Sequence, residues 1–261
     1  MININLTGKR ALVTGGNSGI GEAVVDALSD AGADVAVNYI SHPDAAGAVV
    51  ERVKAKGSRS VAIQADVSDE TQVAGMFEKM DSALGGIDIL VNNAGIDGKA
   101  GRAWELDTAH WKRVLDINLT GAFLMSHEAL RRMVGQRSGV IINMTSVHEM
   151  IPWSGYAAYT ASKAGLSMMT KTLAQEAAPF GVRVLSVAPG AIKTPINKSV
   201  WSDPGGLADL NRKIPMGRMG ERAEIAGMVA VLASNVASYA TGSSIFIDGG
   251  MTDFADFSHG G

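Results

Sequence analysis

The segment from Ser146 to Lys163, SVHEMIPWSGYAAYTASK, holds the side chains whose types and spacing could do chemistry. Tyr159 and Lys163 are four residues apart in a stretch with helical periodicity, which places both on one helix face. A phenol has a pKa of about 10, and an adjacent ammonium favours the phenolate and lowers that pKa. Ser146 closes the apolar run GVIINMTS, so its hydroxyl is expected at a strand end. Together the three side chains could exchange a proton with an alcohol or carbonyl oxygen.

A tyrosine and a lysine at this spacing also occur on exposed helices with no chemical role, where the lysine stem lies along apolar surface. The rest of the chain must therefore decide between the two interpretations. The deciding question is whether other elements bring a cofactor and a substrate to this pair.

A glycine-rich turn links the first predicted strand to the first predicted helix. Residues 9–14 form a short apolar run, GGNSGIG follows at 15–21, and EAVVDALSDAGA then has helical spacing. In this context Gly15 permits the turn, Gly19 lets the backbone approach a pyrophosphate, and Gly21 lets the helix pack on the strand. Free N–H groups at the helix start would face the phosphates. The turn therefore predicts a dinucleotide site.

The end of the second predicted strand, ADVAVNY, bears on the choice of dinucleotide. An acidic residue at this position binds the ribose hydroxyls of NAD, whereas an arginine accommodates the 2′-phosphate of NADP. The chain has neither and reads Tyr39, Ile40, Ser41 and His42. Ser41 or His42 could touch a 2′-phosphate, or both could be ordinary loop residues, so NAD and NADP both remain open.

Polar residues also follow the third and fourth predicted strands. Asp66 ends SVAIQAD, and Asn93 lies in the NNAG that ends IDILVNN. Ligands of doubly wound sheets lie at the carboxyl ends of the strands, so Gly15, Asp66 and Asn93 are expected to converge on one crevice. Ser68 could cap the helix that follows Asp66.

Asn118 stands among apolar neighbours within a long helical pattern at 109–134. Asparagine is a middling-to-poor helix former, and a buried asparagine must find hydrogen-bond partners. Two interpretations are open, a functional role in holding water and a purely structural one.

Strand and helix patterns alternate about seven times along the 261 residues, with no internal repeat or linker. This predicts a single-domain α/β Rossmann fold over 1–261, with a doubly wound, seven-stranded parallel sheet and helices on both faces. Residues 193–217 are loop-rich with little periodicity and are predicted to form a substrate-binding lid.

Composition excludes several classes of function. The net charge of −3 indicates no nucleic-acid or membrane partner, and no apolar run reaches the ~18 residues of a membrane span. There is no cysteine, and the five scattered histidines lack ligand spacing, so no metal site is expected. The start shows no signal-peptide pattern, and a cytoplasmic protein is expected. Ser146 and His148 lack the G-x-S-x-G elbow of a hydrolase.

Taken in order, TGGNSGIG (14–21), NNAG (92–95), Asn118, Ser146, YTASK (159–163) and PG with the following Thr194 resemble the short-chain dehydrogenase/reductase family. The resemblance covers residues 7–250 at least, and Ser146 precedes Tyr159 by the family's usual 13 positions. It implies that Tyr159 is the general acid/base, that Lys163 lowers its pKa and holds the nicotinamide ribose, and that Ser146 orients the substrate oxygen. It also implies that Asn118 holds the water of a proton relay.

The resemblance implies NAD or NADP as the cofactor. The residues that it places at the cofactor are Gly15, Asn17, Ser18, Gly19, Ile20, Gly21, Tyr39, Asp66, Val67, Asn93, Ala94, Gly95, Tyr159, Lys163, Pro189, Gly190, Ile192 and Thr194.

Within the family, SVHE (146–149) with IPW (151–153), GAIKTPIN (190–197), IPMG (214–217) and DGGMT (248–252) are similar to bacterial glucose 1-dehydrogenases. Those enzymes oxidise β-D-glucose to the gluconolactone with NAD or NADP. The similarity implies that the substrate is met by Ser146, His148, Tyr159, Asn197 and Asp203. Asp97 stands where that group carries glutamate, and Ile40 replaces its arginine, which weakens the case for a 2′-phosphate. A homotetramer is also implied, with each C-terminal tail reaching a neighbour's site.

Two other functions stay open. One is a carbonyl reductase of broad substrates, such as a 3-oxoacyl-(acyl-carrier protein) reductase, for which a basic patch beside the cleft would bind the acidic carrier. Candidates for that patch are Lys193, Lys198, Arg212 and Lys213. Scattered lysines and arginines are also common on protein surfaces simply because they are well solvated. A non-catalytic NAD(P)-sensing protein on the same fold would be expected to lack part of the Ser/Tyr/Lys set, all of which is present.

Overall fold

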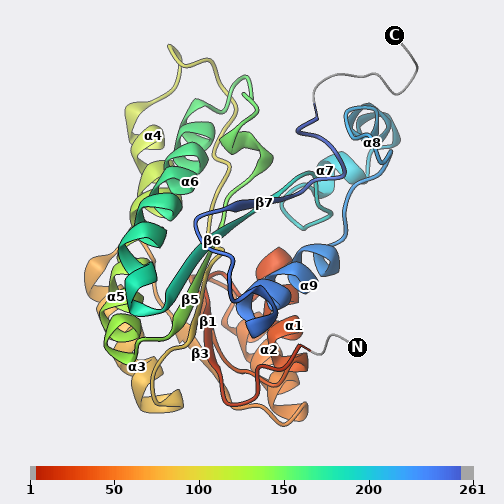
Figure 1. Ribbon diagram of the computed structural model, residues 1–261. Coiled ribbons are helices and arrows are strands. Elements are labelled where there is room, and N and C mark those ends of the chain that lie inside the picture. Colours follow the sequence, from red (N-terminus) through yellow and green to blue (C-terminus); the bar gives the residue numbers. More distant parts are fainter. Residues whose placement is uncertain (1–3, 254–261) are drawn as a thin grey trace.

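The computed structural model describes residues 4–253 and has a seven-stranded sheet at its centre (Figure 1). All strand pairs are parallel, and the order is β3-β2-β1-β4-β5-β6-β7. The strands are β1 (Arg10–Val13), β2 (Asp34–Tyr39), β3 (Ser60–Gln64), β4 (Ile89–Asn92), β5 (Gly139–Met144), β6 (Val182–Pro189) and β7 (Ser244–Ile247). The predicted doubly wound parallel sheet is confirmed.

Helices cover both faces of the sheet (Figure 1). One face carries α1 (Gly19–Asp30), α2 (Pro43–Ala55) and α9 (Arg222–Ala233), and the other carries α3 (Glu70–Leu84), α5 (Ala122–Gln136) and α6 (Ala157–Ala177). Alternation along β1 shows why the core has two halves. Ala11 and Val13 pack toward α1 and α9, whereas Leu12 packs toward the other face.

The strand order reverses between β1 and β4. Val13 of β1 pairs with Val37 of β2 on one side and with Val91 of β4 on the other. The chain runs from β1 through β2 to β3 at one edge and then returns through β4 to β7 at the other edge. Open α/β sheets bind ligands in the crevice that such a reversal leaves at the strands' carboxyl ends.

The helical pattern at 109–134 is not one α-helix. It consists of α4 (Thr108–Leu115), a π-helical turn η1 (Asp116–Gly121) and α5. Asn118 lies in the π-helical turn and is only 1% exposed. Single π-turns are rare and frequently mark functional sites, and nothing in the local sequence pattern distinguishes one from a regular helix.

The segment predicted as a lid contains two short helices, α7 (Lys198–Trp201) and α8 (Pro204–Asn211), so its lack of periodicity concealed real helical turns. The predicted reach of the C-terminal tail to a neighbouring subunit falls largely on residues 254–261, which lie outside the described residues. Within residues 4–253, no helix has the length and apolar character needed to cross a membrane. The same residues contain no group of three histidine or acidic side chains placed to hold a metal ion.

Candidate active site

The turn after β1 is shaped by its glycines. Gly15 and Gly19 have φ angles of +60° and +58°, which favour glycine. A Cβ on Gly21 would come within 2.3 Å of the Gly15 carbonyl oxygen and 2.5 Å of the Asn93 side chain. The start of α1 therefore packs closely against the turn after β1 and against Asn93. Ser18 precedes α1, but its side chain does not cap the helix. The N–H groups in the first turn of α1 can therefore face a ligand.

The ends of β1 and β4 are joined across the reversal by Thr14 and Asn93. The Asn93 side chain donates to the carbonyls of Thr14 at 2.9 Å and Gly15 at 3.3 Å. The Thr14 hydroxyl accepts the backbone N–H groups of Asn93 and Ala94, both at 2.9 Å. From β2, the buried Asn38 accepts the Gly15 N–H at 3.4 Å and donates to two carbonyls at the end of β3. Thr14 and Asn38 were not predicted, although a polar residue within an apolar strand was a signal.

Every residue predicted to bind the cofactor, apart from Tyr159 and Lys163, lies at or just after the carboxyl end of a strand. The groups are Gly15 to Gly21 after β1, Tyr39 at the end of β2, Asp66 and Val67 after β3, Asn93 to Gly95 after β4, and Pro189 to Thr194 at and after β6. This arrangement fits a dinucleotide, because the turn has positive-φ glycines, Gly21 leaves no room for a Cβ, and the start of α1 is uncapped by a side chain.

The polar groups at the ends of β2 and β3 are largely engaged within the chain. Ile40 is 56% exposed, and the Asn17 side chain donates to the Ser41 carbonyl at 2.8 Å. Burial favours a higher pKa for Asp66, but hydrogen bonds from Ser68 and Arg113 lower it below the usual value.

The possible helix cap at Ser68 is wrong. Asp69 caps α3 instead, because its carboxylate accepts the Gln72 N–H at 3.0 Å. The Ser68 hydroxyl donates to Asp66 at 2.6 Å and is thereby occupied. Two neighbouring residues were both acceptable caps by type, and only the competing contact with Asp66 decides between them.

Asn118 joins the loop after β4 to α6. Its side-chain oxygen accepts the Ile96 N–H at 2.9 Å, and its amide donates to the Ile96 carbonyl at 2.9 Å and to Ser162 at 3.1 Å. The side chain is therefore satisfied by the protein itself. A Cβ on Gly95 would lie 3.2 Å from the Asn118 side-chain oxygen and 3.6 Å from the Lys163 ammonium, so this loop passes tightly over both.

Tyr159, Ser146 and Lys163 come together as predicted from their spacing. Tyr159 lies in the first turn of α6, and Ser146 follows β5 and is 6% exposed. The Ser146 hydroxyl accepts the His148 N–H at 3.2 Å and lies close enough to Tyr159 to favour a lower pKa of its phenol. Lys163 is buried, donates to the Met144 carbonyl at 2.8 Å, and lies 5.6 Å from the Tyr159 ring centre.

The expected direction of the tyrosine pKa is not what the structure gives. Burial raises the pKa of Tyr159 to about 12, although the hydrogen bond with Ser146 favours a lower value. Burial also lowers the pKa of Lys163 to about 8, opposed by the charges of Asp97 and Glu149. A neighbouring ammonium favours a lower tyrosine pKa, but the cost of burying both charged forms acts against it.

An aromatic wall lies beside Ser146 and Lys163 and is formed by His148, Trp153, Tyr156 and Tyr159. Trp153 stacks on Tyr156 with ring centres 3.8 Å apart and on His148 at 4.5 Å, and its edge meets Tyr159 at 5.9 Å. The His148 ring bonds the Ile151 carbonyl at 3.1 Å, and burial lowers its pKa. Trp153 and Tyr156 were missed as site residues, although both belong to the short segment between Ser146 and Tyr159 that signals the site.

Asp97 is a half-buried carboxylate close to this wall. Burial raises its pKa, while the charges of Lys163 and His148 lower it in part. Its charge in turn favours a higher pKa for Tyr159. Asp97 therefore lies near enough for its charge to act on all three of these side chains, and its substrate role stays a prediction.

Asn197 and Asp203, the other two predicted substrate residues, are committed to the fold of their own segment. The Asn197 oxygen accepts the N–H and hydroxyl of Thr194 at 3.0 and 3.1 Å, and its amide donates to the Ile192 carbonyl at 2.8 Å. Asp203 caps α8 by accepting the Gly206 N–H at 2.8 Å. Neither side chain is brought to Tyr159 by a contact of this structure, because their turn-forming bonds use the same groups that a sugar would need.

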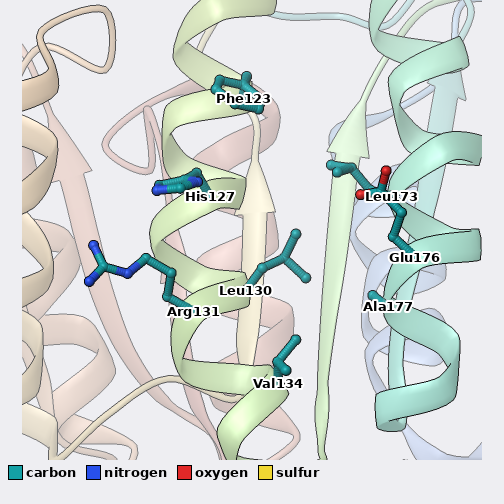
Figure 2. A pocket seen from close by; sticks show the side chains of 8 residues that line it. All are labelled: Phe123, His127, Leu130, Arg131, Val134, Leu173, Glu176 and Ala177. Atoms are coloured by element: carbon teal, nitrogen blue, oxygen red, sulfur yellow. The ribbon is translucent and has the colours of Figure 1, made fainter.

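A cavity lies away from these residues. It is an apolar groove of about 390 Å³ between α5 and α6 (Figure 2). Its lining consists of Phe123, His127, Leu130, Arg131, Val134, Leu173, Glu176 and Ala177. Leu173 stands 14 residues after Tyr159 on α6, roughly 21 Å along the helix, so the groove is a separate surface.

Comparison with known proteins agrees with the motifs. A family model described as "Enoyl-(Acyl carrier protein) reductase" matches residues 15–252. The chain is 43% identical over 257 residues to 3beta-hydroxysteroid dehydrogenase 1 of Eggerthella lenta, covering 98% of both chains. It is 39% identical over 249 residues to glucose 1-dehydrogenase 2 of Bacillus subtilis, covering 95% of this chain and 96% of that protein.

A solved structure agrees equally well. The crystal structure of a gluconate 5-dehydrogenase from Burkholderia cenocepacia, in complex with NADP and tartrate, has a TM-score of 0.91 and 31% identity. The match covers 97% of this chain and 98% of that chain. These relatives share one fold while their names differ in substrate, so the substrate must be argued from the site.

Proposed function

We propose that this chain, which belongs to the short-chain dehydrogenase/reductase family, oxidises a sugar or a related polyol with NAD or NADP, as a glucose 1-dehydrogenase does. Family membership makes the chain an oxidoreductase that acts on hydroxyl or carbonyl groups and uses a nicotinamide cofactor. The substrate and the roles of individual residues are the parts that we propose.

The observation that carries the substrate proposal is Asp97. A half-buried carboxylate beside Tyr159 and His148 accepts hydrogen bonds from hydroxyl groups and repels an anionic substrate. An apolar substrate would leave this buried group without a partner, which is costly. Trp153, in the aromatic wall, is 36% exposed and carries an indole N–H. A neutral molecule with several hydroxyl groups fits this combination better than a gluconate or a steroid.

In the proposed reaction, Ser146 orients the substrate oxygen and Tyr159 exchanges the proton with it. When bound, the nicotinamide accepts or donates the hydride. Lys163 supplies the positive charge that lets Tyr159 lose its proton inside the protein. Tyr159 and Lys163 act as a coupled pair, because loss of one proton gives either a phenolate with an ammonium or a phenol with an amine.

Asn118 is proposed to act through its main chain. Its side chain is fully bonded to Ile96 and Ser162, so the water of a proton relay would have to be held by the backbone carbonyl in the π-helical turn. The side chain then fixes that turn against α6. This assignment unites the two interpretations of Asn118 that the sequence left open.

The cofactor is proposed to be NAD or NADP, with a weak hold on the 2′-phosphate. The residues that follow β2 include neither an arginine nor a lysine before α2, and Ile40 points an apolar side chain into solvent. No carboxylate is present there to exclude a phosphate either. The ratio of activities with the two cofactors tests this part of the proposal.

The test is to follow absorbance at 340 nm with β-D-glucose and with NAD or NADP in parallel. A gluconate and a 3β-hydroxysteroid serve as alternative substrates, and acetoacetyl-coenzyme A with NADPH tests reduction. Reduction of NAD or NADP with glucose or another neutral sugar supports the proposal. Turnover confined to the steroid, the gluconate or the ketoacyl thioester contradicts it, and no turnover with any substrate favours the sensing protein.

The acyl-carrier reductase is the second candidate, because the description of the matching family model names a reductase that acts on acyl-carrier protein substrates. The basic patch that it needs is weak in the structure. Lys193 pairs with Glu221, and Arg212 and Lys213 both pair with Asp209, at distances of 2.7 to 3.1 Å. The two carboxylates offset half of the positive charge of the four candidates, and no ion pair of Lys198 is found among the described residues.

We also propose a homotetramer in the cytoplasm. The groove of Figure 2 suits a second copy, because Arg131 on α5 and Glu176 on α6 stand on its two sides and can meet opposite charges of a copy related by a twofold axis. Mass photometry is expected to give a tetramer for the wild type and smaller species for Leu130→Glu. A monomeric wild type contradicts this proposal without affecting the reaction.

A further inference from the structure

Glu149 connects the two segments that carry the reacting groups. It ends the 3₁₀ turn η2 (Val147–Glu149), and its N–H donates to the Ser146 carbonyl at 2.9 Å. Its carboxylate oxygen Oε1 accepts the Ser167 hydroxyl at 2.9 Å. Ser167 stands four residues after Lys163 on α6 and therefore on the same helix face. A single residue thus contacts both the serine segment and the helix of Tyr159 and Lys163.

A chain of hydroxyl groups extends from this contact into the sheet. Ser167 lies 3.3 Å from the hydroxyl of Ser244 on β7, which lies 2.6 Å from the hydroxyl of Ser186 on β6. Ser167 gives its only hydroxyl proton to Glu149, so it must accept from Ser244, and Ser244 must accept from Ser186. All three hydroxyls are therefore oriented toward the carboxylate. Such an arrangement holds Glu149 in one place.

The second carboxylate oxygen of Glu149 needs a different partner. Oε2 is buried and makes no hydrogen bond within residues 4–253. A buried carboxylate is costly unless an opposite charge lies near it. Burial lowers the pKa of Lys163 to about 8, and the charges of Asp97 and Glu149 are what oppose that effect. Asp97 acts on the lysine from the loop after β4 and Glu149 from η2, and the Tyr159 ring lies 5.6 Å from the ammonium on α6 itself.

We propose that Glu149 is a positioning residue for the reaction, fastening the Ser146 turn to the helix of Tyr159 and Lys163 and balancing the lysine's charge. The inference rests on the proposed dehydrogenase function. The two actions are separable, because the hydrogen bond runs to Ser167 and the charge acts on Lys163. Glu149→Gln keeps an oxygen that can accept from Ser167 and removes the charge, whereas Ser167→Ala removes the hydrogen bond and keeps the charge.

The first test needs no substrate and follows the melting temperature from pH 7.5 to 10. The pKa of Lys163 is about 8 in the folded protein and about 10.4 in an unfolded chain. Between these values the unfolded state binds more protons, so this lysine makes stability rise with pH. Glu149→Gln is expected to move the start of that rise about one pH unit lower, because the lysine loses a stabilising charge.

Two variants serve as controls for this test. Ser167→Ala is expected to leave the start of the rise where it is in the wild type, and Lys163→Met is expected to remove the contribution altogether. Identical curves for Glu149→Gln and the wild type overturn the charge part of the proposal. If Glu149→Gln does not fold, the double variant with Lys163→Met decides: recovered folding supports the pairing, and continued failure contradicts it.

The second test is kinetic and uses β-D-glucose with NAD, or the substrate that gives turnover in the panel above. Ser167→Ala is expected to lower kcat about tenfold without moving the midpoint of the pH profile, because loosened geometry slows the reaction. Glu149→Gln is expected to move the midpoint about one pH unit lower. A wild-type kcat in Ser167→Ala contradicts the fastening role of the Glu149–Ser167 hydrogen bond, and an unmoved midpoint in Glu149→Gln contradicts the charge effect.

The two tests separate this inference from the proposed function. An inactive wild type defeats the function, while the melting curves still report whether Glu149 acts on Lys163. An active wild type with unaltered behaviour in both variants defeats the inference and leaves the function standing.

Discussion

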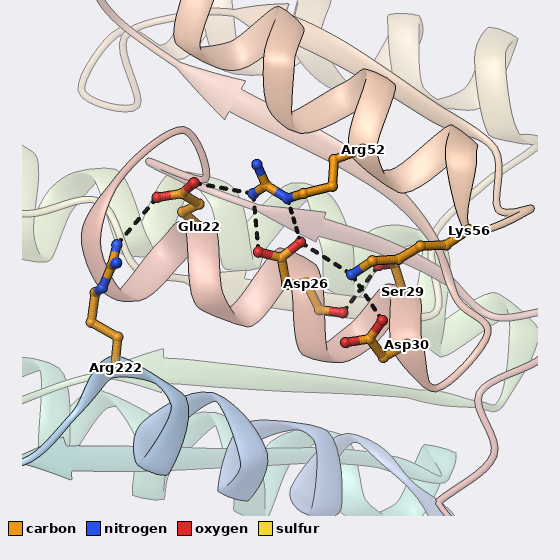
Figure 3. Close-up of polar contacts among 7 residues, drawn as sticks. All are labelled: Glu22, Asp26, Ser29, Asp30, Arg52, Lys56 and Arg222. Atoms are coloured by element: carbon orange, nitrogen blue, oxygen red, sulfur yellow. Dashed lines mark hydrogen bonds and ion pairs between the residues drawn. The ribbon is translucent and has the colours of Figure 1, made fainter.

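Charged groups on the α1 side of the sheet and charged groups at the strands' carboxyl ends have opposite surroundings. The first set forms a network across α1, α2 and α9 (Figure 3). Its members are Glu22, Asp26, Asp30, Arg52, Lys56 and Arg222. Arg52 lies between Glu22 and Asp26, and every charge has an opposite partner at 2.8 to 3.2 Å. All of these side chains are partly exposed.

The second set is buried and poorly matched. Lys163 donates to a neutral carbonyl, Glu149 has one oxygen without a hydrogen bond among the described residues, and Asp97 is half-buried beside Tyr159. Burial moves the pKa values of Tyr159 and Lys163 to about 12 and about 8. Paired, hydrated charges each add little to stability, whereas buried groups with displaced pKa values are characteristic of chemistry. The contrast favours the strands' carboxyl ends as the site that we propose, without reference to any relative.

The largest expected contrast comes from removing one cation from each region. Lys163→Met is expected to lower kcat/KM on the order of 10²–10⁴-fold, because Tyr159 loses the charge that supports proton transfer. Arg52→Met is expected to leave kcat/KM unchanged. Steady-state rates at 340 nm compare the two variants. Equal losses in both would show that the distinction between the two regions has no functional meaning.

Glycine substitutions sharpen the same contrast. A Cβ on Gly21 would meet the Gly15 carbonyl at 2.3 Å, so Gly21→Ala is expected to weaken NADH binding by about tenfold or more, since forced backbone shifts cost about 1–3 kcal/mol. A Cβ on Gly47, in α2, has nothing within 4 Å. Gly47→Ala is expected to stabilise the fold by up to ~1 kcal/mol and leave affinity unchanged. Calorimetric titration with NADH and urea unfolding measure both effects.

The pH dependence of oxidation tests the buried pair itself. Tyr159 and Lys163 must together lose one proton before a substrate hydroxyl can give up its own, and the lysine's pKa of about 8 sets where this happens. The oxidation rate is expected to rise about tenfold per pH unit below that value and to level above it. The reverse reduction is expected to fall over the same range. A flat profile from pH 6 to 10 would rule out the pair as the proton carrier.

The smallest expected effect lies in the charged network. Arg52→Ala is expected to lower the free energy of unfolding by only ~0.5–1 kcal/mol, because its partners remain hydrated. The effect should shrink at high salt, which screens exposed pairs. Urea unfolding at low and high salt measures it. A loss several times larger would mean that this network, too, is effectively buried.

Much of the fold followed from short-range patterns. The apolar runs ending at Val13, Asn92 and Met144 are strands because they are short, continuous and bounded by polar or glycine-rich turns. Gly21 could be interpreted in advance because its neighbours along the chain, a strand and a helix, dictate the contact. Ser146, Tyr159 and Lys163 were found because their spacing is fixed by one strand end and one helix.

The features that escaped prediction depend on contacts between distant segments. The π-helical turn at Asn118 is accompanied by bonds to Ile96 and Ser162, which no local pattern reveals. Asp69 rather than Ser68 caps α3 because Ser68 is drawn to Asp66. The pKa of Tyr159 rises because of burial, a quantity set by the whole fold.

The claim that the buried groups do the chemistry is tested most directly at Tyr159, by comparing wild type and Tyr159→Phe in one assay at 340 nm and by NADH titration. The substitution removes one hydroxyl and keeps the ring that packs against Trp153. The expected result is a loss of turnover on the order of 10²–10⁴-fold with unchanged melting temperature and NADH affinity. Full activity in Tyr159→Phe would contradict the proposed mechanism.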